Sequence, residues 1–221
     1  MEISYFGLSA FKLRGSAATV VTDPYSPEVG WKLPKLAAEI VTVSHQHFDH
    51  NQVDRVEGTK LRPRPLIISA PGEYEAAGIA IYGYASWHDN NQGKERGKNV
   101  IYLVVIDGMR IVHLGDLGHD LRPRLVEELN GVDVLLVPVG GKYTIDARQA
   151  VKMIEAIQPA LVIPMHYKLP GLGETFLDLA EVDKFLEAGG GGEARRMDKL
   201  VMSRDQLPEQ TEYVILSAKT S

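Results

Sequence analysis

Short apolar runs separated by turn residues dominate the first half of the chain and predict β-strands. The runs lie at residues 2–6, 10–13, 18–22, 40–43, 66–69 and 79–84. Two more runs, 99–106 and 110–114, flank Asp107-Gly108, a dipeptide typical of a tight hairpin turn. We therefore expect the first half to form strands joined by tight turns.

The second half alternates between helical and strand-like spacing of its apolar residues. Helices are predicted at 122–129, 147–157 and 177–188, and strands at 132–137, 161–164 and 213–217. Hairpins followed by strand–helix units indicate two sheets covered by helices. No repeat or boundary divides the sequence, so we expect a single domain over residues 1–221, with an ordinary loop at glycines 189–192.

Composition narrows the class of protein. The 221 residues are 44% hydrophobic and 24% charged, with a net charge of −5, which is ordinary for a globular protein and argues against tight nucleic-acid binding. The chain contains no cysteine, which excludes disulfides, thiolate metal ligands and cysteine nucleophiles. It shows neither a secretory signal nor an apolar run long enough to span a membrane, so we expect a cytoplasmic protein with no membrane partner.

The densest group of chemically active side chains is His45, His47, Asp49 and His50, which directly follows a β-branched apolar run. Alternate side chains of an extended segment point the same way, so His45 and His47 can reach one point. If the chain turns into a helix at Asp49, that residue and His50 project toward a second point. This segment therefore predicts two neighbouring metal ions.

Further candidate ligands follow other predicted strands: His88, Asp116 and His166. Each has an ordinary alternative, as a surface histidine, a turn aspartate or a partly buried histidine. Together they offer the further ligands that two metal ions need, since a catalytic zinc typically has three protein ligands. Asp23 ends another strand and either orients a ligand histidine or initiates a turn before proline.

The order of these motifs resembles the metallo-β-lactamase-fold hydrolases, and most closely the compact branch that includes ascorbate-6-phosphate lactonase. The matching segments are Thr22-Asp23-Pro24, Ser44 to His50, Trp87-His88-Asp89, Gly97-Lys98-Asn99, His113 to Gly118 and Pro138 to Gly141. The resemblance implies a four-layer αβ/βα sandwich with the site at one edge of its sheets. It also implies one metal on His45, His47 and His88, a second on Asp49, His50 and His166, and Asp116 as a bridge. Leu8 stands where relatives usually carry histidine, which weakens any substrate contact borrowed from them.

The expected activity is hydrolysis of a small, anionic lactone, ester or phosphodiester. Two ions about 3.5–4 Å apart would hold a shared water and convert it to hydroxide near neutral pH. Asp49 and Asp116 are the expected catalytic carboxylates, and histidine with carboxylate suits zinc first and manganese next. The alternatives are a nuclease acting on RNA or DNA, and a metal-binding protein without catalysis.

Substrate contacts are predicted at Gly141, Thr144 and Tyr167. Backbone N–H groups at the helix start near Gly141 and Thr144 could hold an anion, although capping by Thr144 or Asp146 is the ordinary alternative. Tyr167 could donate a hydrogen bond to an oxyanion or simply pack. Trp31 and Leu33 are candidates for a contact between identical subunits, a pocket lip or the core.

Overall fold

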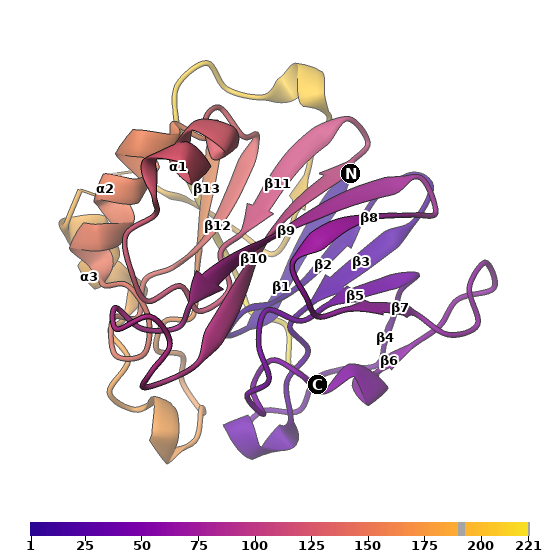
Figure 1. Cartoon of the computed structure of the whole chain (residues 1–221), viewed down its shortest axis with the longest axis horizontal. Helices are drawn as coiled ribbons and strands as arrows, with labels where there is room; N and C mark the ends of the chain where they lie inside the picture. The colour runs from indigo at the N-terminus through magenta and orange to yellow at the C-terminus, as the bar shows by residue number, and fades with distance from the viewer. Residues whose placement is uncertain (190–192, 221) are drawn as a thin grey trace.

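The computed structural model, described for residues 1–189 and 193–220, contains two facing β-sheets (Figure 1). The six-stranded sheet has the order β15 (Leu200–Val201), β1 (Glu2–Gly7), β2 (Ala10–Arg14), β3 (Thr19–Thr22), β5 (Ile40–Thr42) and β7 (Leu66–Ile68). The eight-stranded sheet has the order β14 (Arg195–Met197), β16 (Glu212–Leu216), β13 (Leu161–Met165), β12 (Val134–Pro138), β11 (Met109–His113), β10 (Lys98–Ile106), β9 (Ile79–Trp87) and β8 (Gly72–Ala76). Two short strands, β4 (Leu36–Ala37) and β6 (Val56–Glu57), pair separately.

The helices α1 (Pro123–Leu129), α2 (Ala147–Ile157) and α3 (Val182–Glu187) gather beside β12 and β13 (Figure 1). The α2 helix has the bounds that its spacing predicts. The Asp146 side chain caps it by accepting a hydrogen bond from the Gln149 backbone N–H, and the Gln149 side-chain oxygen accepts one from the Asp146 backbone N–H. The 3₁₀ turns are η1 (Pro27–Val29), η2 (Val53–Arg55), η3 (Glu174–Phe176) and η4 (Arg204–Gln206).

Two apolar clusters show how the layers pack. The larger lies between the sheets and beneath the helices, and it contains Tyr5 and Val20. The smaller lies on the other face of the six-stranded sheet, and it contains their sequence neighbours Phe6 and Val21. Both faces of these strands are therefore buried, which explains their nearly continuous apolar runs.

Irregular segments and the short turns η1 and η2 cover the outer face of the six-stranded sheet. Val29 and Leu33 are buried in the smaller cluster, and the half-buried Trp31 packs against it. The Trp31 indole N–H also donates to the carbonyl of Pro170, 3.1 Å away. Leu33 thus belongs to the core, and a contact between identical subunits through this region stays a prediction.

Two helix predictions were wrong. The helix expected over 177–188 begins only at Val182, because the Ala180 N–H donates to the Gly140 carbonyl and the Ala180 carbonyl accepts from the Lys168 N–H. The chain also does not enter a helix at Asp49: it forms a single turn closed by the His50 N–H and the His47 carbonyl, 3.0 Å apart. Glycines 190–192 of the predicted loop lie outside the described residues. No helix in the described part of the chain has the length and apolar character needed to cross a membrane.

The ends of five strands meet at one edge of the paired sheets. The β9, β11 and β13 strands run in the same direction. Both β9 and β11 pair antiparallel with β10, and β12 pairs in parallel with both β11 and β13. In the other sheet, β3 and β5 are parallel. The Ser44 carbonyl accepts from the Val100 N–H, and the Leu8 carbonyl from the His166 N–H, each at 2.8 Å. These two bonds join the sheets at that edge.

Candidate metal centre

All seven predicted ligand residues lie together at this edge, in two groups. In each group the atoms able to bind a metal lie within 4.8 Å of one another. The first group is His45, His47 and His88; the second is Asp49, His50, Asp116 and His166. Only His47 among them is exposed. The grouping matches the arrangement expected from the sequence, and metal binding by it stays a prediction.

Asp116 lies between the two groups. Its Oδ2 atom is 3.3 Å from Nε2 of His88 in the first group. The same oxygen is 3.3 Å from Nε2 of His50 and 3.2 Å from Nε2 of His166 in the second. One carboxylate oxygen therefore faces both groups, the position that a bridging ligand requires.

Several buried ring nitrogens in these groups have no hydrogen-bond partner among the described residues. They are Nε2 of His45 and Nδ1 of His88 and of His166, whereas Nε2 of His50 and of His166 faces carboxylate oxygens. A buried polar atom without a partner costs about 1–3 kcal/mol, so folding would not favour this arrangement by itself. A divalent cation would supply the missing partner. Imidazole and carboxylate groups are the donors that zinc and manganese take, so the residues fit such ions.

Asp23 organises the segment that carries four of these residues. Its Oδ1 accepts from the Ser44 N–H at 2.7 Å, while its Oδ2 accepts from the Ser44 hydroxyl at 2.6 Å and faces His50 Nδ1 at 2.8 Å. The Ser44 Oγ atom lies 3.0 Å from His45 Nδ1. If both Nδ1 atoms carry the proton, Nε2 of each ring is free to bind a cation. Asp23 itself is fully buried, with φ of 40°.

Electrostatics favour the ligand form of the acidic groups and of His45. Burial alone would raise the pKa of Asp116, but the charges of His166 and His50 hold it well below its usual value. Burial lowers the pKa of His45 to about 2, and the nearby His50 reinforces that shift. Burial also opposes protonation of His50, yet Asp116 and Asp49 raise its pKa well above the ordinary value. A cation would therefore displace a proton from His50 on binding.

Ser9 and Asn99 position Asp116, and neither was predicted as a site residue. The Ser9 hydroxyl donates to Asp116 Oδ1 at 3.3 Å, and the Asn99 side-chain oxygen accepts from the Asp116 N–H at 3.0 Å. Gly115 permits this approach, because a Cβ there would lie 2.3 Å from the Asn99 oxygen. Serine and asparagine are common at turns, so their type carried no signal of this role.

Asp89 holds the polar loop 90–97 beside His88. Its carboxylate accepts from the backbone N–H groups of four residues at 2.8–3.1 Å: Asn91, Gly93, Glu95 and Arg96. Burial opposes ionisation, but these bonds lower the pKa of Asp89 to about 2. The sequence signal was an aspartate at the start of a polar loop, where such carboxylates often accept backbone bonds.

The remaining histidines are occupied elsewhere. His113 Nε2 faces the Ser9 carbonyl at 2.9 Å, and its Nδ1 accepts from the Gly115 N–H at 3.2 Å. His119 Nε2 accepts from the Trp87 N–H, and its Nδ1 faces the Asp120 carbonyl. Neither belongs to the two groups, in agreement with their omission from the predicted ligands.

Leu8 contributes to the site through its backbone rather than its side chain. The side chain is fully buried in the smaller apolar cluster. The carbonyl accepts from the Tyr5 hydroxyl at 3.0 Å as well as from the His166 N–H. This loop therefore supports His166 with leucine in place of histidine.

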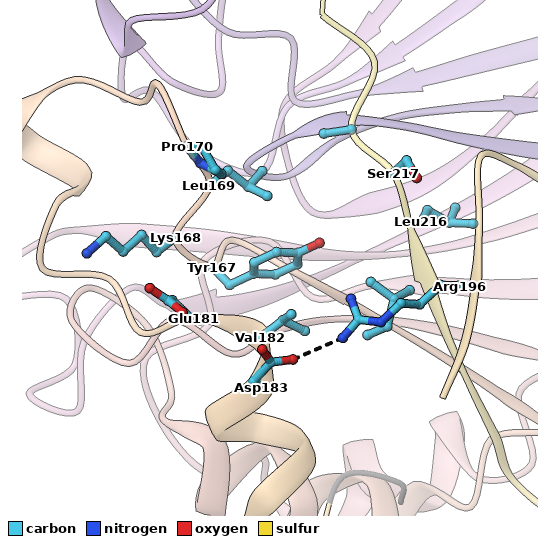
Figure 2. Close-up of a pocket in the computed structure, with 12 residues that line it drawn as sticks. Tyr167, Lys168, Leu169, Pro170, Glu181, Val182, Asp183, Arg196, Leu216 and Ser217 are labelled. Atoms are coloured by element: carbon cyan, nitrogen blue, oxygen red, sulfur yellow. Dashed lines mark hydrogen bonds and ion pairs between the residues drawn. The ribbon is translucent and has the colours of Figure 1, made fainter. Parts of the chain in front are cut away.

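The structure places two of the predicted substrate contacts, Tyr167 and Gly141, on the walls of cavities that the seven candidate ligands do not line. Tyr167 lines a separate cavity of about 410 Å³ with Arg196 and Asp183, which form an ion pair of 2.9 Å (Figure 2). None of the seven ligand residues lines that cavity. Burial raises the pKa of Tyr167 to about 12.

Gly141 lines a further cavity at the start of α2. Asp146 already caps that helix, and the buried Thr144 hydroxyl donates to the Ile145 carbonyl at 3.2 Å. The ordinary capping alternative thus describes this turn. Binding of an anion by the backbone at this turn stays a prediction.

The cavity that does adjoin the first metal group has a volume of about 630 Å³. His45 and His47 form one side of it. The rest of its wall is Ser44, Gln46, Ser69, Ala70, Pro71, Ala85, Ser86, Trp87 and residues 96–100. This volume suits a small molecule.

A family model and proteins of related sequence match this chain. The family model described as a Beta-lactamase superfamily domain matches residues 2–166. A UPF0173 metal-dependent hydrolase of Archaeoglobus fulgidus is 31% identical over 195 residues, covering 76% of this chain and 83% of the relative.

Solved structures extend the likeness to nearly the whole chain. A Thermotoga maritima protein assigned to the Zn-dependent hydrolases of the metallo-beta-lactamase superfamily is 34% identical, with a TM-score of 0.78 and 97% of each chain covered. The metallo hydrolase Igni18 of Ignicoccus hospitalis shares the fold, at 21% identity, a TM-score of 0.66 and coverage of 100% of this chain and 97% of its own. The metallo-β-lactamase-like α/β fold predicted from the sequence is confirmed.

Proposed function

We propose that this chain, which belongs to the metallo-β-lactamase superfamily and within it to the UPF0173 metal-dependent hydrolases, is a binuclear enzyme that hydrolyses a small anionic substrate. The observation that supports two ions is the position of Asp116. Its Oδ2 lies 3.3 Å from His88 Nε2 and 3.2 Å from His166 Nε2, one atom in each group. A single ion would leave one of these groups of buried ligands without a partner.

The metals would supply the electrophilic part of the chemistry. Divalent ions held by the two groups would polarise a substrate carbonyl or phosphoryl oxygen and would lower the pKa of water toward neutrality. The residues fit zinc best and manganese next.

Asp49 is the proposed proton carrier. Burial would raise its pKa, but the charge of His50 and the hydrogen bonds with His166 and His50 lower it, so the carboxylate is ionised near neutral pH. An ionised Asp49 can accept a proton from the attacking water and return it to the leaving group. Asp23 and Ser44 hold the His45 and His50 rings while this transfer occurs.

The shape of the site favours a small substrate over a polynucleotide. The cavity beside His45 and His47 has a volume of about 630 Å³. Its described wall contains two basic residues, Arg96 and Lys98, and the net charge of the chain is −5. A nuclease needs an extended basic track along the substrate backbone. We therefore propose lactone, ester or small phosphodiester cleavage, and keep nuclease activity as the second candidate.

The test combines metal analysis with hydrolysis assays. The purified protein is analysed for metal and assayed on a lactone, ester and phosphodiester panel, alongside His47→Ala and, as a control, His119→Ala outside both groups. We expect about two ions per chain and turnover that His47→Ala abolishes and His119→Ala retains. Two ions without turnover on any substrate would indicate a metal-binding protein without catalysis. No bound metal after addition of zinc or manganese would overturn the proposal.

A further inference from the structure

The cavity beside the first metal group carries an uncompensated positive charge. Arg96 and Lys98 are its two charged wall residues apart from the histidines, and no aspartate or glutamate belongs to the described wall. Neither cation forms an ion pair with a described carboxylate. Positive groups left free beside a cavity favour a ligand of opposite charge.

The position of Arg96 is fixed from two sides. Its guanidinium carbon lies 4.7 Å from the centre of the Tyr143 ring, and the Tyr143 hydroxyl donates to the Thr175 carbonyl at 2.8 Å. Its backbone N–H donates to Asp89 at 2.8 Å, within the loop that follows the predicted ligand His88. Stacking on a ring occupies the face of a guanidinium and leaves its N–H edge free to bind an oxyanion with two parallel hydrogen bonds.

The rest of this wall is mostly apolar. Pro71, Ala85, Trp87 and Val100 line it. The Ser44 hydroxyl donates to the Asp23 carboxylate, and the Ser86 hydroxyl donates to the Asn99 carbonyl, so both are already hydrogen-bonded. The wall therefore offers dispersion contacts to a hydrocarbon group, and Gln46 and Ser69 are the polar side chains left on it.

We propose that Arg96 is the specificity residue of this site and that the substrate is an apolar molecule carrying one terminal oxyanion, a carboxylate or a phosphate. The inference rests on the proposed hydrolase function, and it adds the class of substrate. The apolar body occupies the cavity beside His45 and His47, and the oxyanion binds the N–H edge of Arg96. The bond to be hydrolysed then lies at the metal groups, at the opposite end of the apolar body from the oxyanion.

A matched pair of esters tests the proposal. The 4-nitrophenyl monoester of adipic acid and 4-nitrophenyl hexanoate have acyl chains of equal length, and only the first ends in a carboxylate. The zinc-loaded protein should have a lower KM for the adipate ester. Arg96→Ala should raise that KM about tenfold and leave the hexanoate KM within about twofold, since a charge-assisted hydrogen bond is lost only for the anion.

Two further variants separate charge from geometry. Arg96→Lys keeps the charge but lacks the planar fork, so its KM for the adipate ester should lie between those of the wild type and Arg96→Ala. Lys94→Ala removes a charge from the same loop outside the cavity and serves as the control. Equal increases of the KM for the adipate ester in Arg96→Ala and Lys94→Ala would show that any positive charge near the cavity has this effect. That result would overturn the specific role of Arg96.

A binding measurement distinguishes failure of this inference from failure of the proposed function. Titration calorimetry with adipate and with hexanoate, on the zinc-loaded wild type and Arg96→Ala, requires no turnover. Tighter binding of adipate that Arg96→Ala abolishes would support the inference even if neither ester is hydrolysed. Hydrolysis of both esters with equal KM, unchanged by Arg96→Ala, would overturn the inference and leave the hydrolase proposal standing. A phosphate ester of similar length then shows which oxyanion is preferred.

Discussion

Replacement of Asp23 by asparagine tests how the candidate metal ligands are held. The carboxylate is fully buried and accepts three hydrogen bonds, from the Ser44 N–H, the Ser44 hydroxyl and His50 Nδ1. An asparagine side chain keeps the shape but has only one oxygen. If that oxygen takes the Oδ2 position, the amide NH₂ faces the Ser44 N–H, so this backbone donor loses its partner and the NH₂ group itself faces a donor. The opposite orientation leaves both Oδ2 bonds unmade.

The magnitude follows from the less costly orientation. Each buried donor without a partner costs about 1–3 kcal/mol, so Asp23→Asn should lower the unfolding free energy of the metal-free protein by at least that amount. Partners that orient a ligand histidine typically contribute 10- to 100-fold to metal affinity, and we expect a loss of about this size for zinc. The loss should affect both groups, since Asp23 reaches His50 directly and His45 through Ser44.

Urea unfolding of the metal-free protein measures the first quantity, and competition with a chelator of known zinc affinity measures the second. Asp120→Asn, on an exposed loop, is the control and should change neither. The reasoning is refuted if Asp23→Asn binds zinc within about threefold of the wild type. Reduced stability with that unchanged affinity would make Asp23 a structural residue of the strand end only.

Two other substitutions test packing at the same edge. Leu8→His should lower the unfolding free energy by at least about 2 kcal/mol, because it places an imidazole in an apolar cluster. The volume-conserving control Leu8→Met should lower it by less than about 1.5 kcal/mol. Equal urea midpoints for the two variants would contradict this prediction. Gly140→Ala should destabilise by about 1–3 kcal/mol, because its Cβ would lie 2.1 Å from the His166 carbonyl oxygen. Its control is Gly173→Ala, whose nearest contact would be an ordinary 3.5 Å, and a similar loss in both variants would show that the Gly140 contact is not responsible.

The groups of candidate ligands could be predicted because each member is a polar residue directly after a buried strand. Parallel strands bring such ends to one edge, so His88, Asp116 and His166 meet without any further local signal. Strand alternation placed His45 and His47 together, and the expected change of chain direction at Asp49 separated that residue and His50 from them. The expected helix there was unnecessary, since one backbone turn already redirects His50.

Other features of the fold and of the site depend on contacts between distant segments, which a local sequence pattern does not predict. Leucines 177 and 179 share helical spacing with Val182 and Phe185, but the backbone at Ala180 hydrogen-bonds to two loops instead. Tyr167 follows a candidate ligand in the sequence, yet His166 adopts a left-handed φ of 51° and the next side chain lines a different cavity. Arg96 lies in a polar loop, and its stacking on Tyr143 depends on two segments more than forty residues apart.

Each group of ligands draws on both sheets. In the first, His45 and His47 follow β5 of the six-stranded sheet and His88 follows β9 of the eight-stranded one. The second likewise combines Asp49 and His50 with residues that follow β11 and β13. An ion bound in either group would thus be a crosslink between the two halves of the fold. Its release would lower the kinetic barrier to separating them, so the lifetime of the native protein would depend on its metal supply.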